Sequence, residues 1–129
     1  MSNKNKKYKG FFFAELVVAF AVLGTLMVGL ALSLHSIAKF NRFQLVRQQC
    51  VAAAEAQLDS ISVTGEQVPE EEFKKLWPKI DINIEQSEGA GQWEGMKLIR
   101  AKTSGMSFDA HVNVELSRYI QTPTQAKEQ

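Results

Sequence analysis

One carboxylate, Glu15, lies near the start of the most apolar segment of the chain, which runs from Phe11 to Leu34 and holds no other charged residue. Inserting a charged side chain at the centre of a bilayer costs about 2.5–3.5 kcal/mol. The presence of Glu15 in this segment therefore calls for a structural or functional explanation. One reading is that it marks the helix start and extends to the membrane surface. The other is that it pairs with a cation. The upstream lysines are candidates, and a cut after Gly10 would add the α-amino group of Phe11. Between packed helices, that amine of one subunit could meet Glu15 of another.

The rest of the chain offers no side chains spaced for catalysis or for a cofactor. His111 has Asp109 two residues away, but the sequence places no nucleophile beside them, and a catalytic site needs such groups in mutual reach. Three acids further on lack EF-hand spacing: Asp81, Glu85 and Glu88. We therefore expect no enzyme activity, no cofactor and no metal ion.

The segment that carries Glu15 is long enough to cross a membrane. A helix from Phe11 to Leu34 would be roughly 36 Å long, and the core of a bilayer is about 30 Å thick. A cleaved secretory signal has an apolar region of only about 7–15 residues and then a small-residue cleavage site, and no such site follows Leu34 here. We predict a retained transmembrane helix over residues 11–34. The alternative is a buried core helix of a soluble protein.

Charge is distributed unevenly about this segment. All 14 acidic residues follow the first ten residues, and four of the 15 basic residues lie within them: Lys4, Lys6, Lys7 and Lys9. The positive-inside rule then predicts that residues 1–10 are cytoplasmic and that the part after the span lies across the membrane. That part is net acidic and lacks the basic patch that nucleic-acid binding requires, so we expect no nucleic-acid partner.

A second helical pattern follows the span, over residues 35–62. Apolar residues recur at spacings of three and four, which places them on one face of a helix: Phe43, Val46, Cys50, Ala54, Leu58 and Ile61. No proline or glycine interrupts the segment, so one helix from about Phe11 to Ser62 is expected. Cys50, the only cysteine, is expected to be a small buried residue on this face.

The sequence pattern of residues 63–120 predicts a small α+β domain. Three glutamates followed by two lysines match the dipole of a short helix over Glu70–Leu76, and we prefer that reading to a metal site. Three strand patterns come next, at residues 79–86, 96–103 and 110–120, with a turn predicted over residues 104–109. We expect a small antiparallel sheet of about three strands, whose apolar face is covered by the amphipathic helix. Residues 121–129 form a polar tail.

The N-terminal residues resemble the prepilin leader of type IV pilins and type II secretion pseudopilins. The shared features are a short basic leader, Gly10, then Phe11, and a glutamate five residues into the new chain, Glu15. The resemblance implies cleavage between Gly10 and Phe11 by a membrane prepilin peptidase, N-methylation of Phe11, and a role for Glu15 in aligning incoming subunits. The sequence departs from the usual pattern at residues 12–14, where Phe, Phe and Ala replace a hydroxyl residue and aliphatic residues.

Two further segments, "VAAAEAQLDSI" and "VELSRYI", resemble minor pseudopilins of the I class and related minor type IV pilins. The resemblance implies a pilin-like subunit of the bacterial inner membrane, with a periplasmic domain, at the tip of a secretion or pilus filament. Its partners would be other pseudopilins, the prepilin peptidase and the inner-membrane assembly platform. The alternative is an uncleaved single-span inner-membrane protein with a periplasmic adaptor or sensing domain. A small membrane-anchored enzyme is a further alternative.

Overall fold

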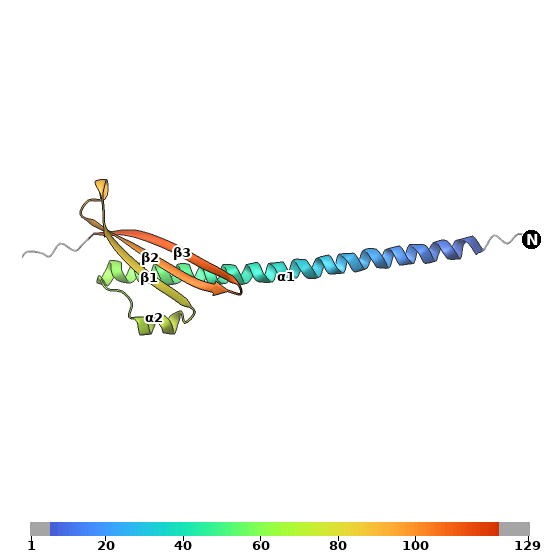
Figure 1. The fold of residues 1–129 in the computed structure, drawn as a ribbon, viewed down its shortest axis with the longest axis horizontal. Coiled ribbons are helices and arrows are strands. Elements are labelled where there is room, and N and C mark those ends of the chain that lie inside the picture. Colours follow the sequence, from blue (N-terminus) through green and yellow to red (C-terminus); the bar gives the residue numbers. More distant parts are fainter. Residues whose placement is uncertain (1–5, 122–129) are drawn as a thin grey trace, which may run out of the picture. The chain divides into compact units, whose positions relative to one another are not determined.

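The computed structural model describes the backbone of residues 6–121 and the side chains of residues 11–121. Figure 1 shows its elements, which are α1 (Lys6–Thr64), α2 (Glu70–Leu76), β1 (Ile80–Glu88), the 3-10 helix η1 (Gly91–Trp93), β2 (Met96–Ser107) and β3 (Ala110–Gln121). The chain divides between Phe40 and Asn41 into two compact units. The fold class is α+β, a long helix packed on a three-stranded antiparallel sheet, as the sequence predicts. Most of the predicted tail, residues 122–129, lies outside the described residues.

The first unit contributes the N-terminal part of α1. Every described side chain from residue 11 to residue 40 is exposed. The hydroxyls within the apolar run are bonded to the helix itself: Thr25 Oγ1 donates to the carbonyl of Val22 at 2.8 Å, and Ser33 Oγ donates to that of Gly29 at 2.9 Å. Such local bonds leave no hydroxyl hydrogen unpaired in an apolar environment.

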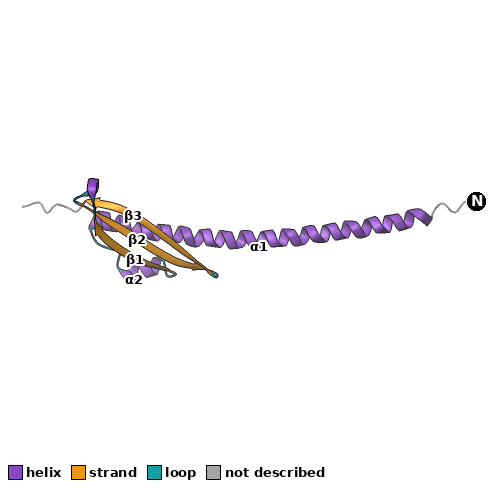
Figure 2. Cartoon of the chain, turned by 45° about the horizontal axis from the view of Figure 1, so that its top comes forward, coloured by secondary structure: helices purple, strands orange, loops and turns teal. Residues whose placement is uncertain are grey.

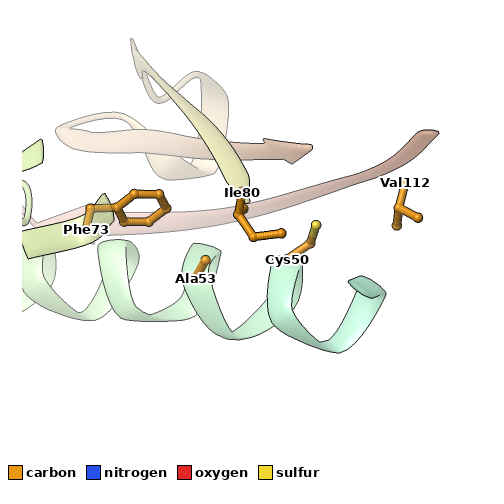
Figure 3. Packing of buried hydrophobic residues seen from close by; sticks show 5 residues of the cluster. All are labelled: Cys50, Ala53, Phe73, Ile80 and Val112. Atoms are coloured by element: carbon orange, nitrogen blue, oxygen red, sulfur yellow. The ribbon is translucent and has the colours of Figure 1, made fainter. Parts of the chain in front are cut away.

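The second unit is built on the last turns of α1, which lie against the sheet (Figure 2). The predicted apolar face is confirmed: Cys50, Ala54, Leu58 and Ile61 are buried, and Phe43 and Val46 are partly buried. Two clusters form the core. One contains Cys50, Ala53, Phe73, Ile80 and Val112, and the other contains Ala54, Leu58, Ile61, Ile99 and Ala101. Figure 3 shows Cys50 and Ala53 on the helix with Ile80 above them.

The sheet has the order β1-β2-β3, with both pairs antiparallel. Strand β2 continues to Ser107, so four residues of the predicted turn, 104–107, are in fact in the strand. The reason lies at Gly105, which pairs with Ile80. A Cβ on Gly105 would come within 2.8 Å of Ile80 Cδ1 and 2.9 Å of Val46 Cγ1. This glycine therefore allows close packing of helix on sheet rather than a turn.

Two polar side chains are buried where the helix meets the domain. Thr103 Oγ1 donates a hydrogen bond to the carbonyl oxygen of Cys50 at 3.0 Å, which joins β2 to α1. The Gln57 amide binds the backbone of Val68 in both directions, accepting from its N–H at 3.0 Å and donating to its carbonyl at 3.4 Å. Buried polar groups are tolerated when they are bonded in this way. The second pair fixes the connection between α1 and α2.

Helix α2 has the predicted bounds, Glu70–Leu76. Its first turn carries three glutamates and its last turn two lysines, as the helix dipole favours. Lys74 Nζ lies 2.7 Å from Glu70 Oε1 in an exposed pair that lowers the pKa of Glu70 and raises that of Lys74. Phe73 anchors the helix in the core and contacts Trp77 with ring centroids 5.2 Å apart. The three glutamates therefore belong to a solvated helix start.

Candidate functional site

The three residues expected to direct processing and assembly lie in the N-terminal part of α1. The backbone of Gly10 is helical, and the side chains of Phe11 and Glu15 are exposed. Phe11 and Glu15 are four residues apart, so they share one face of the helix, one turn apart. Within residues 11–121, no ion pair involves Glu15. Among the described side chains, that of Glu15 is exposed and makes no ion pair.

The apolar run that follows is also presented outward. One helix is long and apolar enough to cross a membrane, and none of its most apolar window is buried by the described chain. Phenylalanine, leucine, valine and methionine side chains cover all sides of it, as in Phe20, Leu26 and Leu32, which are each more than 60% exposed. A soluble protein rarely exposes an apolar surface of this size. The alternative of a buried core helix thus finds no support in the described residues.

The histidine and the acidic residues that were considered as possible catalytic or metal-binding groups lie on the surface of the second unit. Asp109 lies in the turn between β2 and β3, and His111 is exposed at the start of β3. On β1, Glu85 Oε1 is paired with Lys102 Nζ at 2.7 Å, and this contact lowers the pKa of Glu85. Among the residues that the structure describes, no three His, Cys, Asp or Glu side chains gather as a metal site. The expectation that the chain is not an enzyme stays a prediction.

Cys50 is unsuited to act as a nucleophile in the folded domain. Its side chain is fully buried in the core. Burial raises the pKa of its thiol, because the charged thiolate loses hydration. The reactive form of cysteine is the thiolate, so both accessibility and ionisation are reduced. This residue is a packing element, as the sequence predicts.

Two side-chain contacts in the second unit could not be predicted from the sequence. Strand β3 is an outer strand of the sheet, and Arg118 Nη1 on it binds Asp59 Oδ1 of α1 at 2.6 Å. At the end of β1 farthest from Ile80, Trp93 stacks on Tyr119 with ring centroids 4.7 Å apart. Neither feature has a local sequence signal, because each joins residues far apart in the chain.

A groove of about 500 Å³ is the other feature that the sequence did not reveal. It is lined by α1 residues from Arg42 to Gln49, by the connection from α2 to β1, and by the end of β2 with Phe108. The guanidinium carbon of Arg42 lies 4.8 Å from the centre of the Phe108 ring. Such a cation–π contact holds the turn between β2 and β3 next to the helix.

Comparison of the chain with protein-family models, with curated proteins and with solved structures finds no match.

Proposed function

We propose that this chain is a minor pseudopilin or minor pilin, a subunit of a type II secretion or type IV pilus-like filament in the bacterial inner membrane. One observation carries the proposal. A basic leader and Gly10 are followed by an exposed apolar stretch that begins with Phe11 and carries Glu15, and the same helix continues into the core of a small α+β domain. That combination suits a subunit that is held in the membrane before it enters a filament.

In this proposal the N-terminal residues have distinct roles. A prepilin peptidase cuts between Gly10 and Phe11, and the new amino group of Phe11 is methylated. A methylated secondary amine remains basic, so it retains a positive charge near neutral pH. Glu15, presented on the same helix face one turn away, supplies the opposite charge. The amine of one subunit and the carboxylate of the next then pair in a low-dielectric environment, where the attraction is stronger than in water.

The domain of the second unit then faces the periplasm. It would contact other pseudopilins through the exposed side of α1 and through the outer strand of the sheet. At the filament tip, these contacts would prime assembly on the inner-membrane platform. The antiparallel sheet supports this role, because an outer strand offers unpaired backbone groups to a partner.

The mass of the protein extracted from membranes tests the proposal. We expect a chain that begins at Phe11 and carries one additional methyl group, in cells that contain a prepilin peptidase. In a strain that lacks the peptidase, the chain should retain the leader. If the extracted protein begins at Met1 or Ser2 in both strains, the chain is an uncleaved single-span protein, and the proposal is wrong.

Glu15→Gln tests the pairing role separately from cleavage. Glutamine has nearly the same size and is cheaper to place in a membrane, so insertion and cleavage should be unaffected. The charge pair is lost, however, and the amine of the neighbouring subunit keeps its desolvation cost. We expect crosslinking to pilin-like partners to fall about tenfold, the equivalent of about 1.4 kcal/mol. Crosslinking at the wild-type level, with normal processing on the same samples, would contradict the pairing.

A further inference from the structure

The two outer strands of the sheet differ in how their free edges are covered. At the edge formed by β1, residues of α2 and residues 80–82 of the strand line one pocket together, so the helix lies beside that edge (Figure 1). Strand β3 pairs with β2 without a bulge from Ala110 to Gln121, and it contains no proline or lysine. Bulges, prolines and lysines are common means of keeping an edge strand from pairing with another chain. An inward-facing charge, Arg118 bound to Asp59, protects the far end of β3, so residues 110–117 are left without such protection.

A second groove, of about 560 Å³, follows this unprotected edge, and we call it the edge groove. Residues 111–116 of β3 form one side of it, and Phe43, Arg47 and Val51 of α1 form the other. Phe43 and Val51 are half-buried, whereas Arg47 is exposed. The edge groove therefore combines the free backbone groups of an outer strand with a helix face that carries two apolar residues and one cation.

The three α1 residues of the edge groove are spaced like the side chains of an extended strand. They are four residues apart, so they lie on one face of the helix with a rise of roughly 6 Å from each to the next. In a strand, the side chains on one face recur at every second residue, about 6.4–6.8 Å apart. A strand paired with β3 would thus place three alternate side chains next to Phe43, Arg47 and Val51 in turn.

The central position of this series carries a positive charge that the domain does not neutralise. Among residues 11–121, no ion pair involves Arg47. The acid that also lines the edge groove, Glu115, has its Oε1 4.0 Å from Nε of Arg100 on β2. Complementary charges across an interface fix its register and exclude wrong partners. The segment that complements this helix face therefore reads apolar–x–acidic–x–apolar, and it reads the same in both chain directions.

We propose that β3 accepts an extended segment of another protein as an added strand, with apolar side chains on Phe43 and Val51 and a carboxylate on Arg47. In this mode of recognition, main-chain hydrogen bonds to the edge strand supply affinity, and contacts of alternate side chains supply specificity. None of β1, β2 and β3 has the pattern apolar–x–acidic–x–apolar, so the occupant is a different protein and not the sheet of a second copy. The inference rests on the second unit alone, and not on leader cleavage or filament assembly.

A tethered probe strand provides the test. The full chain, in detergent, carries the probe after Gln129 on a flexible glycine–serine linker, which raises the effective concentration of the probe to about the millimolar range. One probe has the core Val-Thr-Glu-Thr-Val, and a control probe of the same composition has the core Val-Glu-Thr-Thr-Val, in which the carboxylate faces away from α1. Hydrogen exchange of the β3 amides is measured by mass spectrometry, because the outward N–H groups of an edge strand exchange until a partner binds them. We expect the first probe to slow exchange over residues 110–117 about fivefold more than the control probe, the equivalent of about 1 kcal/mol.

Variants of the helix face separate recognition of the charge from folding. Arg47→Gln should remove the difference between the two probes. Arg47→Glu should reverse the preference, so that a probe with the core Val-Thr-Lys-Thr-Val protects β3 and the glutamate probe does not. Lys97→Gln, which removes an exposed cation outside the edge groove, should leave the difference unchanged. The buried thiol of Cys50 should stay unreactive in each variant, which shows that the core is intact.

Exchange of β3 that is the same with either glutamate probe as with none would overturn the proposal, as would equal protection by both probes that ignores Arg47→Gln. Protection of β3 that rises with the concentration of the chain without a probe would assign the edge to a second copy, and would overturn it too. Each of these results can be obtained whether or not the leader is cleaved, so failure here is distinguishable from failure of the proposed function.

Discussion

Leu58→Asp is expected to unfold the second unit. Leu58 is 2% exposed and packs in a cluster with Ile61 and Ile99. Removing a buried leucine side chain costs about 2–5 kcal/mol, and a buried carboxylate without a cation adds a further penalty. Small domains have a total stability of about 5–15 kcal/mol, so the loss is comparable with the whole. Aspartate at this position would be hydrated only if the helix separated from the sheet.

Labelling of Cys50 provides the measurement. Its thiol is fully buried and is the only thiol in the chain, so it reacts quickly only when the core opens. In the full chain in detergent, we expect slow labelling of the wild type and rapid labelling of Leu58→Asp. Val63→Asp is the matched control, because Val63 is 84% exposed on the same helix. Surface substitutions usually change stability by less than about 0.5 kcal/mol. Equal protection of Cys50 in Leu58→Asp would contradict the assigned core.

Gly10→Val is expected to abolish processing of the leader. Under the proposed function, the peptidase accepts glycine before the cut, and a branched side chain there is expected not to fit the site. The apolar run from residue 11 to residue 34 is unchanged, so the protein should still insert in the membrane. The mass of the extracted protein should therefore correspond to the whole chain, with no methylated Phe11.

Gly24→Val is the matched control for that experiment. Gly24 lies within the apolar run, and an added Cβ would meet no atom within 4 Å among the described residues. The same substitution there adds the same apolar volume but leaves residues 10 and 11 untouched. We expect normal cleavage of Gly24→Val. Mature protein of normal size from Gly10→Val would contradict the prepilin assignment, whereas a block in both variants would indicate a general defect of insertion.

The sequence by itself determined the features that depend on neighbouring residues. The length and apolarity of residues 11–34 predict a membrane-spanning helix, and the structure contains a helix that meets this requirement. The period of three and four residues identified Cys50 and Leu58 as core positions, and both are buried. Charges matched to the dipole located α2 with its correct bounds. These signals are local, because helix geometry repeats within a few residues.

Only the tertiary structure decided the features that join distant parts of the chain. Gly105 looked like a turn residue, yet it lies in β2, where it pairs with Ile80 and where an added Cβ would come within 2.9 Å of side-chain atoms of Ile80 and Val46. Thr103 is buried because its hydroxyl reaches the carbonyl of Cys50, 53 residues away. The groove beside Arg42 requires α1, α2 and the turn after β2 together. No periodicity in one segment reports such contacts, since they depend on which surfaces meet when the helix covers the sheet.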